Sequence, residues 1–284
     1  ISNSTDTVFT VSLVVTNGCS YDTSSNTVSI FPQPNLSFSV SQDSICSGDE
    51  ITFINTSTGL INTYWDFGDG LSSTQYSPTH GYQTAGTYFA SLIGAGSEYG
   101  CIDTVSQRII VIQTPSVNIS VQDTFGCQPF ELSFDNYSQF GDFYAWEFGD
   151  GNSSGLENPN HIYLSNGVFD GSLITSNNLG CSDSVNFQVT VYPQPVSSFD
   201  IESQSLCILP DTIQLTNQST GAIGYGWNFG NGQSSAENNP TAIFESAGDF
   251  YISLIAYSEQ NCADTSYLEY SNSSVPEADF SFSS

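Results

Sequence analysis

The two histidines of the chain are the first residues to test for catalysis, because general acid–base and nucleophilic sites most often use histidine. His80 and His161 lie one 81-residue interval apart, and the equivalent position one interval later is Ala242. A residue repeated in two units and lost from a third favours a structural role, in packing and a hydrogen bond. No Ser-His-Asp or Cys-His set can be assembled from these histidines, so we predict no enzymatic activity.

Paired acidic residues form a second candidate site, since neighbouring carboxylates can perform acid–base chemistry or bind calcium. Asp66 and Asp69 are matched by Glu147 and Asp150 one interval later, whereas the third occurrence has two asparagines. Asp-Gly and Asn-Gly steps supply the positive φ that tight hairpin turns need, so we predict a turn. Calcium in other acidic loops, for instance near Asp49-Glu50, is an alternative that the sequence leaves open; no cofactor or metal ligand is assigned.

Seven cysteines are present. Six of them form one opening and one closing cysteine per unit, separated by 55, 54 and 55 residues in the three units. This spacing predicts three disulfides inside the units: Cys46–Cys101, Cys127–Cys181 and Cys207–Cys262. Cys19 has the phase of a closing cysteine, so its partner is expected upstream of residue 1. No Cys-x-x-Cys occurs, which disfavours a metal site. Disulfides require an oxidising compartment, so we expect a secreted or surface-exposed protein.

The charge of the chain excludes several functions. Asp and Glu number 29 against a single basic residue, Arg108, which gives a formal net charge of -28. Nucleic-acid binding and polybasic membrane anchoring both need Lys and Arg, so neither is expected. No run of 18 apolar residues is present, so no membrane insertion is expected in this segment. The acidity favours solubility and mutual repulsion, with cation bridging between chains as the alternative.

A repeat of about 80 residues organises these candidates. Trp65, Trp146 and Trp227 each open the phrase Trp-x-Phe-Gly-Asp/Asn-Gly, and we predict that each tryptophan fills the core of a unit. Short proline-rich linkers between units favour semi-rigid spacing. We expect complete units at 36–115, 116–195 and 196–276, the last part of a preceding unit at 1–35 and the start of another at 277–284. The array is therefore expected to continue in both directions.

Each unit has the pattern of short strands. In the first complete unit the β-rich runs are Ile51–Thr56, Thr63–Phe67, Thr87–Ile93 and Thr104–Ile112. Along the third run, Ala90 and Leu92 are predicted to face the core, while Phe89 and Ser91 face outward. Alternation of this kind is typical of a two-sheet antiparallel sandwich, and the fold class is therefore expected to be all-β.

These motifs together resemble the PKD (polycystic kidney disease) domain, an immunoglobulin-like β-sandwich. The resemblance rests on Trp65-Asp-Phe-Gly-Asp-Gly70, Pro78-Thr-His-Gly-Tyr82 and Gly86-Thr-Tyr88, and it covers all three complete units and both fragments. The second unit departs from it at Gly167-Val-Phe169, and the third has Ala242 for histidine. The resemblance implies tandem immunoglobulin-like (PKD) sandwiches that form an elongated array.

Tandem, cysteine-closed units of this kind are similar to those of large secreted surface proteins of Bacteroidetes-type bacteria, such as adhesins and fibres exported by the type IX system. We therefore expect a structural stalk segment of a long extracellular adhesin or surface fibre, which spaces a distal binding tip from the bacterial cell. The expected partners are neighbouring repeats of the same chain. A bundle of identical chains is a further alternative.

The alternative is a set of accessory or binding modules on a secreted enzyme that degrades polysaccharide or protein. Such modules would need a row of exposed aromatic residues that repeats in phase. Tyr76, Tyr99 and Tyr137 do not repeat in phase, which disfavours this alternative.

Overall fold

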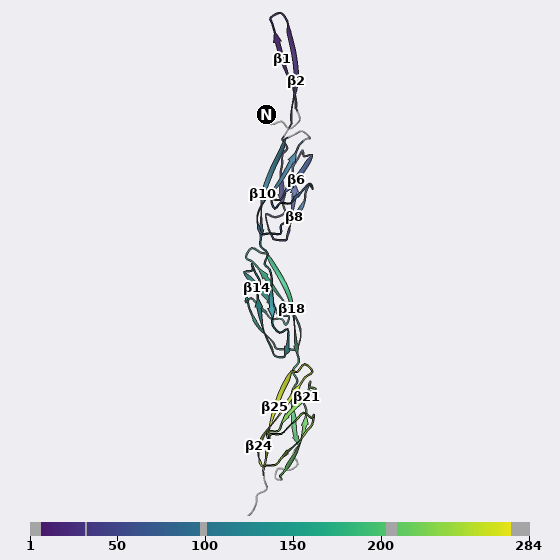
Figure 1. Cartoon of the computed structure of the whole chain (residues 1–284), viewed down its shortest axis with the longest axis vertical. Helices are drawn as coiled ribbons and strands as arrows, with labels where there is room; N and C mark the ends of the chain where they lie inside the picture. Colours follow the sequence, from purple (N-terminus) through teal and green to yellow (C-terminus); the bar gives the residue numbers. More distant parts are fainter. Residues whose placement is uncertain (1–6, 32, 97–100, 203–208, 274–284) are drawn as a thin grey trace, which may run out of the picture. The chain divides into compact units, whose positions relative to one another are not determined.

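The chain is built from β-strands, as the computed structural model in Figure 1 shows. It describes residues 7–31, 33–96, 101–202 and 209–273. No helix occurs within these ranges, so the predicted all-β class is confirmed. It follows that these ranges hold no helix of the length and apolar character needed to cross a membrane.

The N-terminal described segment is a hairpin, drawn in purple in Figure 1. Strand β1 (Thr7–Thr16) pairs antiparallel with β2 (Tyr21–Ile30), with Thr7 opposite Ile30 and Thr16 opposite Tyr21. Most side chains of both strands are exposed, including Val11 and Leu13. Cys19 lies in the turn between the strands and is also exposed.

The first sandwich comprises β3 to β10. Its three-stranded sheet has the order β3 (Phe38–Val40), β5 (Glu50–Asn55), β8 (Thr79–Gly81). Its five-stranded sheet has the order β4 (Ser44–Cys46), β10 (Ile102–Ile112), β9 (Gly86–Ala95), β6 (Asn62–Asp66), β7 (Ser72–Ser73). One apolar core fills the space between the two sheets, since Phe53, Trp65 and Leu92 belong to a single buried cluster.

The second sandwich comprises β11 to β18 and has the same topology. Its sheets run β11 (Ile119–Val121), β13 (Phe130–Asn136), β16 (Asn160–Tyr163), and β12 (Phe125–Cys127), β18 (Ser182–Tyr192), β17 (Gly167–Ser176), β14 (Phe143–Glu147), β15 (Ser153–Ser154). Phe134 of one sheet packs on Trp146 of the other, with ring centroids 5.2 Å apart.

The third sandwich comprises β19 to β25. Its sheets run β19 (Phe199–Glu202), β20 (Asp211–Asn217), β23 (Thr241–Phe244), and β22 (Ser234–Ser235), β21 (Gly224–Asn228), β24 (Gly248–Tyr257), β25 (Ala263–Asn272). Residues 203–208, which hold Cys207, lie outside the described residues.

Side-chain alternation explains why these segments form half-buried strands. In β9, Ala90 and Leu92 have no exposed surface, whereas Phe89 is 62% exposed. Leu173 in β17 and Leu254 in β24 are buried in the same phase. The predicted inward and outward faces of this strand are thus confirmed, as a period of two along a pleated strand requires.

The three tryptophans lie in the cores at equivalent places. Trp65, Trp146 and Trp227 are each at most 2% exposed. Each indole Nε1–H donates to a backbone carbonyl ten residues later, at 3.0, 2.9 and 2.8 Å respectively. The indole therefore buries its apolar surface while its one donor is satisfied, as a buried tryptophan requires.

A short parallel pairing of two strands fixes where Cys46 and Cys127, the opening cysteines of the first two sandwiches, lie. Strand β4 runs parallel to the last residues of β10, with Cys46 opposite Ile112. Strand β12 repeats this arrangement, with Cys127 opposite Tyr192 at the end of β18. Each of these two cysteines therefore lies beside the point where the last strand of its sandwich passes into the following linker.

We expect the folded chain to resist trypsin. Arg108 is the only Lys or Arg in the sequence, and it lies in β10, which pairs with β9 on one side and β4 on the other. Cleavage needs several residues to leave the sheet, so it requires local unfolding. Mass spectrometry of a native digest should show intact chain, and a denatured digest should show two fragments after reduction. Equal cleavage rates in both conditions would contradict the assignment of Arg108 to a paired strand.

Candidate functional site

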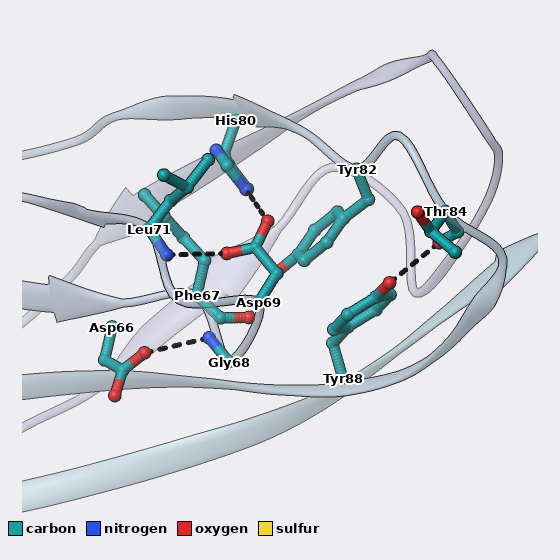
Figure 2. A network of polar contacts seen from close by, with 9 residues as sticks. All are labelled: Asp66, Phe67, Gly68, Asp69, Leu71, His80, Tyr82, Thr84 and Tyr88. Atoms are coloured by element: carbon teal, nitrogen blue, oxygen red, sulfur yellow. Dashed lines mark hydrogen bonds and ion pairs between the residues drawn. The ribbon is translucent and has the colours of Figure 1, made fainter.

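The turn that follows each tryptophan contains the acidic and histidine residues selected from the sequence. In the first sandwich the Asp66 carboxylate accepts a hydrogen bond from the Gly68 N–H at 2.9 Å. The Asp69 carboxylate accepts from the Leu71 N–H at 3.0 Å and contacts His80 Nε2 at 2.7 Å. Figure 2 shows that the two acids have separate partners and do not form one carboxylate pair. The arrangement braces a turn, as predicted.

The His80 ring is held by aromatic contacts as well as by Asp69. It stacks on Phe67 at 4.0 Å between centroids and meets the edge of Tyr82 at 4.7 Å. The Tyr82 hydroxyl donates to the Phe67 carbonyl at 2.9 Å. These contacts join β8 to the turn after β6, so the histidine packs and hydrogen-bonds as the sequence indicated.

The electrostatics of this turn stabilise the charged form of Asp69. Partial burial alone would raise the pKa of the Asp69 carboxyl, but hydrogen bonds from His80 and the Leu71 N–H hold it below its usual value. Burial, followed by the nearby Asp69 charge, raises the pKa of the Tyr82 phenol. Tyr82 therefore stays neutral and acts as a hydrogen-bond donor.

The second sandwich repeats the network. His161 Nε2 lies 2.8 Å from Asp150, and its ring stacks on Phe148 at 4.1 Å. The Tyr163 hydroxyl donates to the Phe148 carbonyl at 3.0 Å. Burial raises the pKa of Asp150, but hydrogen bonds from Asn152 and His161 outweigh it and lower the pKa.

The third sandwich closes the same turn with neutral groups. Asn231 Nδ2 donates to the Ile243 carbonyl at 2.9 Å, and Asn228 accepts from the Gly230 N–H at 2.9 Å. Ala242, in the position of the histidines, is fully buried. Since an amide closes the same turn here, the Asp–His pair of the other two sandwiches is accounted for by the structure of the turn.

Sequence reasoning treated the histidines and the acids separately and did not predict that they pair. A signal for the pairing was present. The units with Asp69 and Asp150 carry His80 and His161, while the unit with Asn231 carries Ala242. Joint loss of both residues from one unit is what a direct contact between them would produce.

The lowered pKa values of Asp69 and Asp150 predict acid sensitivity in the first two sandwiches. A carboxyl whose pKa is lower in the folded state contributes stability above its unfolded pKa of about 3.9. That contribution is lost as the pH falls through the folded value. The double variant Asp69→Asn, Asp150→Asn should therefore lose less stability below about pH 4 than the parent chain.

Hydrogen exchange followed from about pH 7 to about pH 3 measures this effect strand by strand. The third sandwich, which already has Asn231, is the internal control and should behave alike in both chains. An identical acid response of the first two sandwiches in parent and variant would contradict the stabilising role of the carboxylates.

The cysteines are the second feature, and here the structure corrects the predicted pairing. Cys46 bonds to Cys181, and Cys127 bonds to Cys262, each across a sequence separation of 135 residues. Each disulfide joins the opening cysteine of one sandwich to the closing cysteine of the next. The predicted bonds Cys46–Cys101, Cys127–Cys181 and Cys207–Cys262 are therefore wrong, the last because Cys262 is bonded to Cys127.

Strand length explains the correction. Cys46 lies beside Ile112, at the end of β10, whereas Cys101 precedes Ile102, at its start. The eleven residues of β10 separate the two positions by roughly 35 Å at about 3.3 Å per residue. A disulfide needs Cα atoms within about 7 Å, so the predicted bond cannot close. The observed Cys46 and Cys181 Cα atoms are 5.7 Å apart.

Hydrogen bonds next to the first disulfide tie the linker to both sandwiches. The Thr114 N–H donates to Ser47 Oγ at 3.1 Å, and its hydroxyl donates to the Ser47 carbonyl at 2.9 Å. Asn177 Nδ2 donates to the Gln113 carbonyl at 2.9 Å, while Asn177 Oδ1 accepts from the Cys181 N–H at 3.0 Å. Consistent with these contacts, segments 138–143 and 175–183 of the second sandwich belong to one structural unit with the first sandwich.

The second disulfide has a comparable setting. Gln194 Nε2 donates to the Ala263 carbonyl at 2.9 Å, and the Ser197 N–H donates to Asp264 at 2.8 Å. Ser258 Oγ accepts from the Cys262 N–H at 3.1 Å. Both closing cysteines, Cys181 and Cys262, are only 1% exposed, so their sulfurs are shielded from thiols in solution.

The other cysteines have separate outcomes. Cys101 and Cys19 are free and exposed among the described residues, and Cys207 lies outside them. A partner for Cys19 upstream of residue 1 stays a prediction. Within the described ranges, no group of three or more His, Cys, Asp or Glu side chains is placed to hold a metal ion.

Comparison with known proteins agrees with the sandwich fold and its motifs. Family models described as "PKD domain" match residues 32–111, 114–191 and 204–267, which together exceed half of the chain. A microbial collagenase of Vibrio alginolyticus is 36% identical over 69 residues, which cover 22% of this chain and 8% of the collagenase. The chain thus corresponds to a small fraction of that protein.

Solved structures with similarity include two isolated PKD1 domains. That of the Vibrio cholerae metalloprotease PrtV is 27% identical, covers 28% of this chain and 99% of its own, and has a TM-score of 0.26. That of Vibrio anguillarum Epp is 26% identical, covers 28% of this chain and 96% of its own, and has a TM-score of 0.25.

Proposed function

Because the chain belongs to the PKD domain family, we propose that it is a spacer segment of a longer extracellular protein, an adhesin or surface fibre of a bacterial cell. The observation that carries the proposal is the disulfide between consecutive sandwiches, seen twice. A binding or catalytic module needs only its own fold to be stable. A spacer, in contrast, gains from covalent bonds that join one module to the next.

Three further features support this function: the short linkers, the negative net charge, and the structural role of the Asp–His contacts. Short linkers with hydrogen bonds such as Thr114 to Ser47 restrict the chain between sandwiches. A net charge of -28 opposes collapse of one module on another and favours solubility. The Asp–His contacts are accounted for by turn structure. The disulfides support an oxidising compartment outside the cytoplasm as the location of the segment. Units 36–115, 116–195 and 196–276 are proposed as its modules.

Removal of one module from the native gene tests the spacer function. Deletion of residues 116–195 should shorten the distance between the cell and the far end of the protein, while ligand binding by the rest of the protein is retained. Gold-labelled antibodies against the far end, imaged on intact cells, measure that distance. An unchanged distance, or loss of ligand binding with the distance retained, would contradict a spacer.

A second candidate function is favoured by the similarity to part of a collagenase, namely that the modules help a secreted enzyme to bind its insoluble substrate. Exposed aromatic residues such as Tyr137 and Phe143 would then contact the substrate. Sedimentation of the purified chain with collagen fibrils or insoluble polysaccharide distinguishes the two functions. The spacer proposal predicts no co-sedimentation, and saturable co-sedimentation lost in Tyr137→Ala or Phe143→Ala would favour the enzyme module.

A further inference from the structure

The two disulfides enclose overlapping loops of the chain. The first loop runs from Cys46 to Cys181 and the second from Cys127 to Cys262. Cys127 therefore lies within the first loop, and Cys181 lies within the second. Every peptide bond between Cys46 and Cys262 is spanned by at least one disulfide.

From this overlap we propose that the disulfides form a second covalent path along the chain, so that the array stays in one piece when its linkers are cut by proteases. The statement that this path protects a stalk rests on the proposed spacer function. The covalent connection of the cut fragments does not depend on that function. The path runs from Cys46 to Cys181, back along the second sandwich to Cys127, and on to Cys262.

The linkers are the segments that most need such a path. The first linker is Gln113–Pro115 and the second is Tyr192–Pro195. Gln113 and Val196, which directly follows the second linker, are exposed. Linkers between folded modules are the preferred sites of proteolytic cleavage. If each disulfide had formed within one sandwich, every linker would be a single covalent connection. One cut there would then separate the array into two parts.

The overlap tolerates more than one cut. A cut in the first linker leaves Cys46 joined to Cys181, and a cut in the second leaves Cys127 joined to Cys262. Both linkers can be cut together, because the middle fragment holds Cys127 and Cys181 and so remains attached on each side. In each disulfide the closing cysteine, Cys181 or Cys262, is buried and its sulfur is shielded from external thiols, whereas Cys46 and Cys127 are half-buried.

Trypsin sites placed in the linkers test the proposal. The sequence has no lysine and only Arg108 as a cleavage residue, so Gln113→Lys and Val196→Lys introduce defined sites before Thr114 and Ser197. The full chain carrying both changes is digested, free thiols are alkylated, and the product is run on a denaturing gel. We expect one band of full length without reductant and three fragments with it.

Two cysteine variants provide the matched comparison. On the doubly cut background, Cys46→Ser should release the fragment 1–113 without reductant, while Cys19→Ser, which removes an exposed free cysteine, should release nothing. If the folded linkers resist trypsin, digestion in denaturant without reductant replaces the native digest. Trypsin then also cuts after Arg108, so the fragment to follow is 1–108, and the peptide 109–113, which has no cysteine, leaves in every variant. Release of fragments from the parent, or retention of 1–113 in Cys46→Ser, would overturn the proposal.

A tether experiment separates this proposal from the spacer function. A bead held to a surface by the doubly cut chain should stay attached under flow and detach when reductant is added. Detachment on trypsin treatment alone would refute the second covalent path, even if imaging on cells supports a spacer. Continued attachment would support the path even if that imaging contradicted a spacer.

Discussion

Replacement of Gly149 by alanine should destabilise the second sandwich by about 2–4 kcal/mol. Gly149 lies in the turn after Trp146 with φ of +85°, a conformation that costs other residues about 1 kcal/mol. A Cβ at this position would lie 2.5 Å from the Asp170 carbonyl oxygen and 2.8 Å from the Asp170 nitrogen. Because both atoms are backbone of the central strand β17, relief of the clash requires the strand to move.

Gly151→Ala is the matched control in the same turn. Gly151 also has a positive φ, of +90°, but a Cβ there would meet nothing within 4 Å. Its substitution should cost only about 1 kcal/mol, from the backbone conformation alone. Hydrogen exchange of β14 and β17 compares the two variants. Equal destabilisation would show that the close approach of the turn to β17 is not a constraint.

Replacement of Trp146 by alanine should have the largest effect, a loss of about 3–5 kcal/mol. The side chain has no exposed surface and packs against Phe134 at 5.2 Å and Phe187 at 6.1 Å between ring centroids. A module of this size has roughly 5–15 kcal/mol of total stability. The change therefore removes a large part of it, and denaturant unfolding followed by hydrogen exchange in β13 and β17 measures the loss.

Two further variants separate the contributions at this position. Trp146→Phe keeps most of the apolar volume but loses the hydrogen bond to the Leu156 carbonyl, so its cost should lie well below that of alanine. Phe143→Ala changes an aromatic residue of the same strand that is 60% exposed, and it should shift stability by less than about 0.5 kcal/mol. A Trp146→Ala effect as small as that of Phe143→Ala would contradict the buried tryptophan core.

The fold was predictable because its signals are local and repeated. The alternation at Ala90 and Leu92 follows from strand geometry, and the Gly-Asp-Gly phrase after Trp65 follows from the φ values that a tight turn requires. Repetition at a constant interval made each signal visible three times. An all-β sandwich could be inferred without knowing which residues far apart in the sequence are in contact.

The disulfide pairing was not settled by spacing, because both pairings repeat from unit to unit. Cys46 and Cys127 lie 55 and 54 residues before their own closing cysteines, and each lies 135 residues before that of the next unit, Cys181 or Cys262. The deciding fact is that β4 runs parallel to the end of β10, which places Cys46 at the linker and Cys101 a full strand length away. A three-residue strand with a parallel, non-local partner has no distinctive sequence pattern.

The pairing of consecutive sandwiches is tested most directly on the unmodified chain by one digest. Trypsin cuts after Arg108 only. The first fragment then holds Cys19, Cys46 and Cys101, and the second holds Cys127, Cys181, Cys207 and Cys262. The chain is unfolded in denaturant without reductant, its free thiols are alkylated, and the cut product is run on a non-reducing denaturing gel. The bond between Cys46 and Cys181 predicts a single band of full length that splits into two only on reduction. Two separate fragments before reduction would contradict it, because they would show that no disulfide joins the first sandwich to the second.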